Sequence, residues 1–248
     1  FYFKKENKIL FSLPGVPSEL EYLYENAVKP ILKDNFRLDG VIKTRIIHTA
    51  GVGDSGIDSM IGDLELLQNP TVGLAAHPGN VDIRITARAE SAEAADKMIN
   101  KIAEIVEYRL SPAIFGFDGE TLPQQISNKL IQENSSLSCI LLGISRELVK
   151  KNIPENSDQF RVLFLEDSSF DTNPTEINPQ NMLLSATLEK SSQPSRLLLS
   201  YQAADEVKEA CRAYSGPQDQ VDLWAWNTCL AFIWEQINSG TRRANDKS

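Results

Sequence analysis

The sequence is poor in the residues on which several common kinds of site depend. Only two histidines occur in 248 residues, His48 and His77, so we expect neither a multi-histidine metal site nor a Ser-His-Asp triad. The three cysteines are odd in number and show no CxxC spacing, which favours a reducing cytoplasm. No run of 18 apolar residues occurs and the first residues have no signal-peptide pattern, so we expect no membrane segment.

Positive charge is scarce as well. Lysine and arginine total 25 against 34 aspartates and glutamates, which gives a formal net charge of -9 and a sequence pI near 4.9. This balance disfavours a protein that binds the phosphate backbone of nucleic acid. The apolar fraction of 42% and the charged fraction of 24% are ordinary for a globular protein, and the length allows one to three domains.

Residues 1–38 contain too few predicted helices and strands to fold alone. An apolar run at 8–13 predicts one strand, which Pro14 and Gly15 end. Ser18 is then placed to cap a helix with apolar residues at helical spacing, and Pro30 should bend or end that helix. Because one strand and one helix cannot enclose a core, we interpret this segment as the remnant of a domain that lies upstream.

Residues 39–117 have the clearest pattern and predict a compact α+β unit of order β-α-β-β-α. Strands are expected at 41–50, 70–77 and 81–88, and helices at 57–67 and 92–110. The turn Pro78-Gly79-Asn80 joins the last two strands as an antiparallel hairpin, and the strict alternation after it indicates that one face is solvated. Ser91 is placed to cap the second helix.

Residues 118–241 form a less regular third unit. From Thr121 onwards we expect a helix, strands at 138–144 and 160–165, a hairpin of 182–188 with 195–201, and a last helix at 219–237. The acidic stretch 167–180 has few apolar residues and lacks the EF-hand glycine, so it indicates a solvated loop instead of a calcium site. Trp226 lies off the apolar stripe of the last helix, which suggests an interface, and residues 242–248 should be a disordered tail.

One glycine-rich string follows the strand at 41–50. The stretch GVGDSG at 51–56 has the GxGxxG spacing of a dinucleotide-binding turn, but the strand before it is polar and the next strands form a hairpin. Its second half also fits the GxxG loop with which KH modules clamp a nucleic-acid backbone, although Asp54 would repel phosphate. A turn that begins a helix is therefore the favoured interpretation.

Four strings occur in order along the chain: LPGVPSEL, GVGDSGIDSMIGDL, NPTVGLAAHPGNVDIRITARA and IFGFDGETL. Together they closely resemble the competence/damage-inducible protein CinA family over residues 8–135. The resemblance implies that residues 1–38 end a molybdopterin-binding-like domain, that 39–117 form a KH-like domain with a structural role, and that 118–241 form a nicotinamide-nucleotide amidase-like domain. The expected fold class is α/β plus α+β, with a KH-like β-α-β-β-α domain followed by a shortened three-layer α/β domain.

The first string gains a role from this resemblance. A strand that ends in Pro-Gly before a helix start can present backbone N–H groups to an anion, or can be only a sharp turn. In the family this string resembles the last phosphate-site loop of a domain associated with ADP-ribose pyrophosphatase activity. Pro14, Gly15, Ser18 and Glu19 are therefore candidate nucleotide-binding residues of a partial site, and a nucleotide would bind with the help of an upstream domain.

The third unit departs from the family pattern at the catalytic positions. The family's amidase serine belongs to an Ala-Glu-Ser-Cys-Thr-Gly-Gly stretch, and Leu142 stands in its place here with no Thr-Gly-Gly after it. The chemistry needs a serine deprotonated by a lysine of lowered pKa, and glycine N–H groups that hold the oxyanion. We therefore predict a degenerate amidase-like domain with no catalytic residues. The alternative pairs a displaced Ser138 or Ser145 with Lys150 or Lys151.

These expectations combine into one prediction and two alternatives. The chain should be a non-catalytic scaffold and dimer-forming part of a CinA-like protein linked to nicotinamide-nucleotide or ADP-ribose metabolism, with no cofactor and no metal. Apolar faces on the helix at 18–35 and around Trp226 motivate the homodimer. The alternatives are a nicotinamide mononucleotide amidohydrolase with a displaced active site and, disfavoured by the negative charge, an RNA-binding KH-like module.

Overall fold

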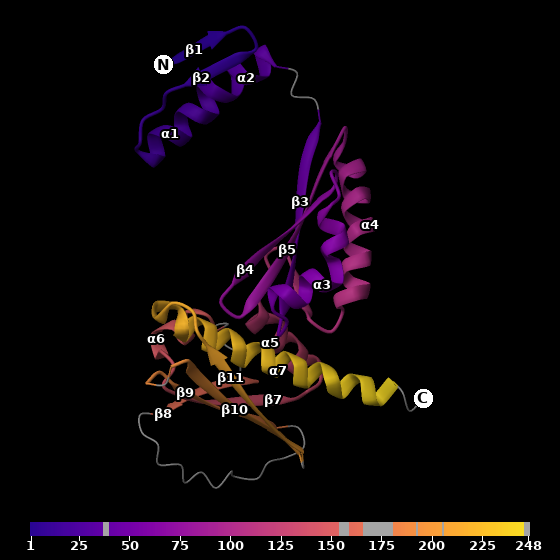
Figure 1. Cartoon of the computed structure of the whole chain (residues 1–248), viewed down its shortest axis with the longest axis vertical. Coiled ribbons are helices and arrows are strands. Elements are labelled where there is room, and N and C mark those ends of the chain that lie inside the picture. Colours follow the sequence, from indigo (N-terminus) through magenta and orange to yellow (C-terminus); the bar gives the residue numbers. More distant parts are fainter. Residues whose placement is uncertain (37–39, 154–158, 166–180, 192, 205, 246–248) are drawn as a thin grey trace.

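The computed structural model describes residues 1–36, 40–153, 159–165, 181–191, 193–204 and 206–245, and these form three units along the chain (Figure 1). In the described residues, a two-stranded sheet with a broken helix is followed by a four-stranded sheet and then by a five-stranded sheet, both covered by helices. This mixture confirms the predicted α/β plus α+β class. Across the described ranges no helix is long and apolar enough to cross a membrane.

The N-terminal unit contains one strand more than predicted. β1 (Tyr2–Lys5) pairs antiparallel with β2 (Lys8–Phe11), and the chain continues into α1 (Pro17–Leu23), a π-helical turn η1 (Tyr24–Val28) and α2 (Lys29–Asn35). The four residues of β1 are exposed, so they lack the apolar alternation that identifies a strand.

Two details of this helix differ from the prediction or refine it. Ser18 does not cap it: Val16 occupies the N-cap and no side chain caps the first turn, because the helix already begins at Pro17, whose φ is preset for a first helical position. The π-helical turn lies directly before Pro30, which has no N–H to donate. The helix is therefore interrupted at the proline and not ended by it.

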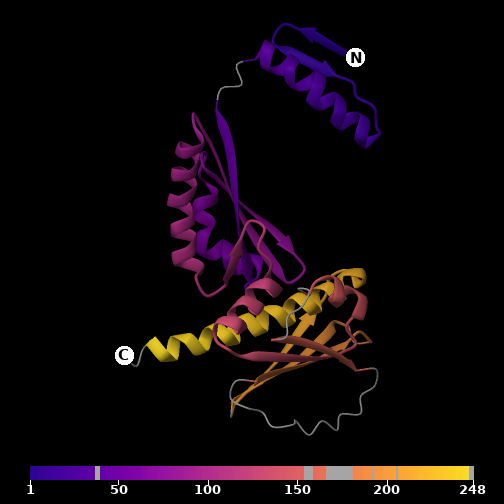
Figure 2. The same cartoon turned by 180° about the vertical axis from the view of Figure 1, so that it is seen from behind.

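The second unit has the predicted elements and one more. Its sheet has the order β4-β5-β3-β6 with every neighbouring pair antiparallel, and α3 and α4 cover one face (Figures 1 and 2). The bounds are β3 (Val41–Ala50), α3 (Asp54–Glu65), β4 (Thr71–His77), β5 (Asn80–Ala89), α4 (Ala92–Leu110) and β6 (Ile114–Phe117). The predicted order β-α-β-β-α lacked β6, which is only 4 residues long. α4 has the predicted bounds, and Ser91 Oγ accepts a hydrogen bond from the Ala94 N–H at 3.2 Å, which confirms the predicted cap.

The third unit is built on a mixed sheet. β7 (Ser136–Leu142) lies between β8 (Phe160–Leu165) and β9 (Asn181–Glu189) and runs parallel to both, while β10 (Ser195–Ala203) and β11 (Glu206–Tyr214) continue antiparallel from β9. β9 and β10 confirm the predicted hairpin. β11 was missed because it is an edge strand whose sequence, EVKEACRAY, mixes charged and small residues.

In the described residues the helices of this unit pack on one face of the sheet. They are α5 (Leu122–Gln132), α6 (Arg146–Lys151) and, after a 3-10 turn η2 (Gln218–Gln220), α7 (Val221–Asn245). On the other face Leu163 and Leu198 are 57% and 40% exposed. The described part thus has two layers where the family resemblance implied three.

Two further predictions concern segments at the limits of the described residues. Residues 242–245, expected to be disordered, continue α7, because the helix runs past the last predicted position. Residues 246–248 and the loop predicted at 167–180 lie outside the described residues.

The helix α7 is buried on two sides, which explains one wrong prediction. One side packs on β9 and β10, and the other contacts β3 and β5 of the second unit. Trp226 is therefore fully buried, with its ring stacked 6.4 Å from that of Phe160, and it does not present the apolar surface expected at an interface. A helix covered by two units buries more than one apolar stripe, so a single stripe could not predict which residues are exposed.

Candidate functional site

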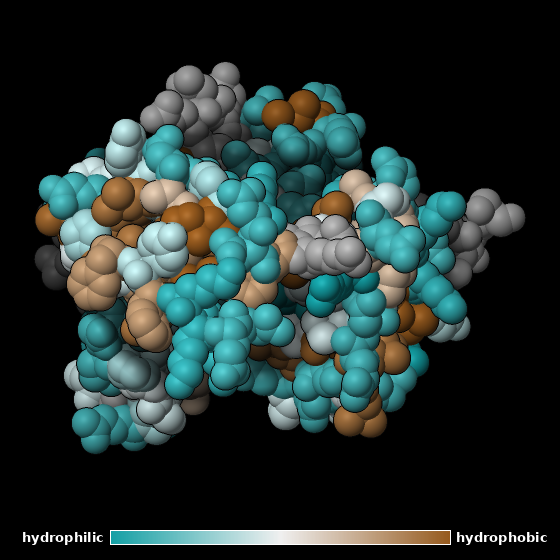
Figure 3. All heavy atoms as spheres, turned by 90° about the horizontal axis from the view of Figure 1, so that it is seen from above, coloured by the Kyte–Doolittle hydropathy of each residue, from teal (hydrophilic) through white to brown (hydrophobic). Residues whose placement is uncertain are grey.

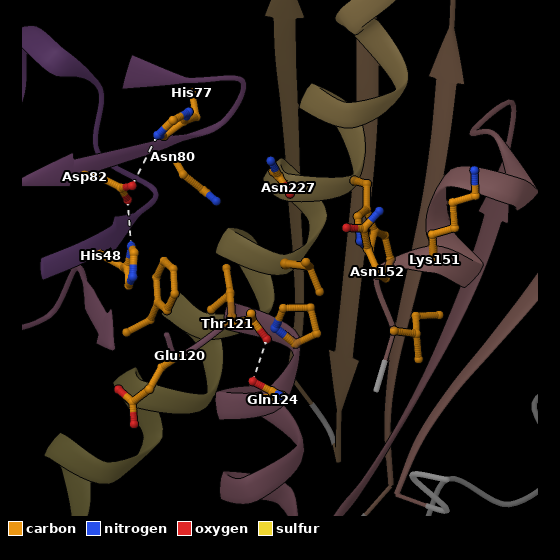
Figure 4. A pocket seen from close by; sticks show the side chains of 16 residues that line it. His48, His77, Asn80, Asp82, Glu120, Thr121, Gln124, Lys151, Asn152 and Asn227 are labelled. Atoms are coloured by element: carbon orange, nitrogen blue, oxygen red, sulfur yellow. Dashed lines mark hydrogen bonds and ion pairs between the residues drawn. The ribbon is translucent and has the colours of Figure 1, made fainter. Parts of the chain in front are cut away.

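A cavity of about 500 Å³ lies where the second and third units meet (Figure 4). β3, β4 and β5 supply His48, His77 and Asp82 to one wall, and α7 supplies Asn227 to the other. The turn between β4 and β5 brings the walls together, since Gly79 has a φ of +87° and a Cβ on it would lie 2.8 Å from the Cβ of Asn227. Only glycine combines this backbone conformation with so close an approach.

Two histidines share one carboxylate in this cavity. His48 Nδ1 lies 2.7 Å from Asp82 Oδ1, and His77 Nε2 lies 3.2 Å from Asp82 Oδ2. The second nitrogen of His48, Nε2, lies 2.7 Å from the carbonyl oxygen of Asp118, and the ring stacks on Phe115 at 5.5 Å. Both nitrogens of His48 therefore face acceptors, and only the protonated ring has two N–H groups to donate.

The electrostatics agree with a protonated His48. Burial on its own would lower the pKa of His48, but the hydrogen bonds to the Asp82 carboxylate and the Asp118 carbonyl outweigh it, and the pKa lies above its ordinary value of 6.5. His48 is thereby held between β3, β5 and the turn that leaves β6. In this position it acts as a structural link.

The arrangement offers no activated nucleophile among the described residues. The lining residues contribute one hydroxyl, that of Thr121, and it donates to Gln124 Oε1 at 2.9 Å instead of to a histidine. In the described residues no group of three or more His, Cys, Asp or Glu side chains could hold a metal ion.

The predicted nucleotide-binding residues lie elsewhere. Pro14 and Gly15 occupy the turn after β2, and Ser18 and Glu19 belong to the first turn of α1; all but the half-buried Pro14 are exposed. The four residues share one surface turn of the N-terminal unit and do not line the cavity. Their role in nucleotide binding stays a prediction.

The resemblance to the family places Leu142 at the position of the amidase serine, and the structure puts Leu142 at the end of β7. Leu142 is the last residue of the strand, and Gly143 follows with a φ of +79°. A Cβ on Gly143 would collide with the carbonyl oxygen of Leu188. Position 143 therefore accepts only glycine, while Leu142 beside it is half-buried.

The displaced serines are not paired with lysine. Ser145 Oγ accepts a hydrogen bond from the Leu148 N–H at 3.4 Å and so caps α6. Ser138 lies on β7, on the opposite face from the buried core. The hydrogen bonds found among the described residues join neither serine to Lys150 or Lys151, which are exposed in the last turn of α6.

The glycine-rich string has the predicted local role. Gly53 occupies the N-cap of α3 and Asp54 begins the helix, which confirms a turn that starts a helix. The same loop faces Arg212 of β11 and Trp224 of α7 across a second cavity of about 310 Å³. The loop that KH modules use for a nucleic-acid backbone thus faces the third unit here.

Nothing in the sequence marked several of the residues that line the cavity as parts of a site. Asp82 belongs to a regular alternating strand, and Asn227 lies in a helix whose apolar residues dominate its pattern. The Asn227 amide donates to the carbonyl oxygen of Pro78, 149 residues away, at 2.7 Å. Only the string HPGN, which marks a tight turn, pointed to this region before the structure.

Comparison with known proteins shows which family the chain resembles. Residues 44–116 match the family model described as the damage-inducible protein CinA KH domain. A CinA-like protein of Prochlorococcus marinus (strain NATL2A) is 33% identical over 164 residues, which cover 64% of this chain and 38% of that protein. The chain belongs to the CinA family. The resemblance predicted from the four strings is confirmed, and the second unit is the KH domain.

Two other relatives define how much of a CinA protein the chain covers. A putative competence-damage inducible protein of Clostridium botulinum (strain Langeland / NCTC 10281 / Type F) is 32% identical over 221 residues, 87% of this chain and 51% of that protein. A CinA-like protein of Dictyoglomus thermophilum is 36% identical over 161 residues, 62% of this chain and 38% of that protein. The chain spans about two-fifths to one half of the length of these relatives.

Proposed function

We propose that this chain is a non-catalytic scaffold and dimer-forming portion of a CinA-family protein linked to nicotinamide-nucleotide or ADP-ribose metabolism, acting in the cytoplasm. The proposal rests on the end of β7, where Leu142 stands at the position that the resemblance assigns to the family's serine. A leucine side chain has no proton to give up and cannot attack a carbonyl carbon. The neighbouring Gly143 approaches the Leu188 carbonyl so closely that this position cannot carry a side chain.

The polar groups near Leu142 form contacts that stabilise the fold. The Ser145 N–H donates to Asp222 Oδ1 at 2.8 Å, and Lys190 Nζ forms an ion pair with the same carboxylate at 2.9 Å. A catalytic lysine must lose its proton to activate serine, and a carboxylate partner opposes that loss. These groups tie the start of α6 to α7 and to the end of β9.

A scaffold role fits the way in which the units are joined. α7 packs on the sheet of the third unit and on β3 and β5 of the KH domain, and Asn227 donates to the turn after β4. The third unit therefore holds the KH domain in a defined place even without chemistry of its own. The N-terminal unit exposes apolar side chains, which supports the proposal of a dimer (Figure 3).

Ammonia release from nicotinamide mononucleotide tests the proposal. The full chain, its Ser145→Ala variant and a bona fide CinA amidase are assayed side by side. The proposal predicts release by the amidase only. Turnover by the wild-type chain that Ser145→Ala abolishes would support a displaced active site and contradict the scaffold role.

A further inference from the structure

The N-terminal unit is too thin to enclose a core of its own. Among its described residues only Val28 is buried, while Leu20, Tyr22 and Tyr24 of the helix are 39%, 67% and 42% exposed. Two strands and one broken helix are not stable in water without a further surface to pack on. The helix of this unit therefore needs another surface against it.

The outward side of this helix is acidic. Residues 17–28 contain three glutamates and no lysine or arginine. Glu21 and Glu25 are both exposed, and because they are four residues apart they lie on one side of the helix together with Tyr22. Lys29 forms an ion pair with Glu25 at 2.8 Å, so it offsets one of these two negative charges.

The KH sheet carries two arginines on the face opposite α3 and α4. Ile83 and Ile85 of β5 are fully buried under the two helices. Because the side chains of a strand alternate, Arg84 and Arg88 of the same strand point to the opposite face, where both are exposed. The middle of that face is therefore open and positively charged.

The neighbours of these arginines are small or apolar. Ile42 of β3 lies opposite Arg88 and is 69% exposed. Three threonines form a row across the face between the two arginines, one from each of β4, β5 and β3. We call this set the basic face: Ile42, Thr44, Thr71, Arg84, Thr86 and Arg88. None of its members is acidic, although the chain has a net charge of -9.

An acidic protein surface suits the basic face better than nucleic acid does. The basic face has no aromatic side chain on which a base could stack, and the negative charge of the whole chain repels a polyanion. Residues 17–28 match the basic face instead, because they combine carboxylates with the exposed ring of Tyr22.

The acidic helix and the basic face do not cover each other within one chain. Figures 1 and 2 show the N-terminal unit beyond the start of β3, on the side of the KH sheet away from α4. Tyr22, Arg84 and Arg88 are all exposed in this arrangement. A two-fold axis between two copies brings the helix of each onto the basic face of the other, so that every such contact is made twice.

We propose that two copies of this chain associate by placing residues 17–28 of each copy on the basic face of the other. Glu21 and Glu25 then lie against Arg84 and Arg88, and Tyr22 packs near Ile42. The inference rests on the dimer of the proposed function and names the surfaces that form it.

Charge reversal on each side tests the pairing. The helix variant Glu21→Arg/Glu25→Arg and the face variant Arg84→Glu/Arg88→Glu each place like charges against one another in the dimer. Each should raise the dissociation constant of the dimer at least about tenfold. Light scattering should then give the single chain mass of 27.6 kDa at a concentration where the wild type gives twice that mass.

The helix variant and the face variant complement each other. In an equal mixture, the basic helix of one meets the acidic face of the other, and the remaining helix and face keep their original charges. The mixture should therefore recover the double mass. A variant with all four substitutions should recover it as well, and this recovery excludes misfolding as the reason for the loss.

Lys97→Glu/Lys101→Glu is the matched control. Both lysines are exposed on α4, which packs on the other face of the KH sheet. The substitution changes the net charge as much as the face variant does, and the protein should remain dimeric.

The outcomes separate this inference from the proposed function. Single masses for the helix and face variants, with the double mass for their mixture and for the control, support it. A double mass for the wild type and for both variants overturns it and leaves the dimer of the proposed function standing. A mixture that stays at the single mass also overturns it. A single mass for the wild type contradicts the dimer itself, and this inference with it.

Discussion

His48 of β3 is hydrogen-bonded to the backbone carbonyl of Asp118, 70 residues further along the chain. Asp118 has a φ of +53°, its N–H donates to the Ile46 carbonyl, and its Oδ1 accepts from the Ile46 N–H, both at 2.9 Å. The turn that leaves the KH domain for α5 is thus tied to β3 by backbone and side chain. The contact between His48 and the Asp118 carbonyl depends on the protonation of His48.

Stability should therefore depend on pH through His48. Its pKa is raised in the folded chain, so the stabilisation is complete below the ordinary value of 6.5 and is lost as the pH rises through the folded pKa. His48→Gln should lower the free energy of unfolding by about 1–3 kcal/mol near pH 6 and by less near pH 8.5. Urea unfolding at both pH values measures the difference.

His77→Gln is the matched control for this prediction. His77 is the other histidine of the chain, is half-exposed and contacts the same carboxylate at the longer distance of 3.2 Å. Its substitution should cost less than that of His48 at the acidic pH. An equal loss for His48→Gln at both pH values would contradict the imidazolium link.

Gly143 should be intolerant of any side chain. Its φ of +79° is unfavourable for L residues, and a Cβ would collide with the Leu188 carbonyl. Gly143→Ala should lower the free energy of unfolding by more than about 2 kcal/mol. Gly51→Ala has the same φ and nothing within 4 Å of its Cβ, so it should cost about 1 kcal/mol. Equal costs in thermal or urea unfolding would show that the turn after β7 is open.

The three cysteines should differ in reactivity. Cys211 is exposed on β11, whereas Cys139 and Cys229 are buried, and burial raises the pKa of both thiols. A thiol reagent at neutral pH should label one cysteine in the folded chain and all three in denaturant. Cys211→Ser should abolish the native labelling. Rapid labelling of the variant would mean that the core of the third unit opens.

The proposed dimer should depend on the N-terminal unit. Leu20 and Tyr22 of α1 are 39% and 67% exposed, so their replacement by lysine removes apolar surface without emptying a core. Light scattering should give twice the chain mass of 27.6 kDa for the wild type and the single mass for Leu20→Lys/Tyr22→Lys. Tyr108→Lys on α4, at 88% exposure, should remain dimeric. A monomeric wild type would contradict the proposal.

The elements that could be predicted have a regular spacing of apolar residues within their own sequence. α4 has 19 residues with apolar positions at helical spacing and a serine cap, so its bounds follow from local chemistry. β1, β6, β11 and α6 could not be predicted: β1, β6 and α6 are only 4 to 6 residues long, and β11 is an edge strand with several charged residues. The fold class is therefore more predictable than the number of strands.

The cavity was harder to predict than the fold. Its walls come from β3, β4 and β5, from the start of α5, and from α6 and α7, and the bond between Asn227 and Pro78 spans 149 residues. Nothing local distinguishes Asp82 from another polar residue of an alternating strand. The end of β7 was different, because the resemblance to the family assigned Leu142 to the position of the amidase serine before the structure.

The most direct test of the central claim is ammonia release from nicotinamide mononucleotide by the purified full chain, over hours and beside an active CinA amidase. Leu142 in place of the nucleophile predicts release no faster than in a blank without protein. Sustained release above that blank, in proportion to the amount of chain, would contradict the claim that the end of β7 has lost its chemistry.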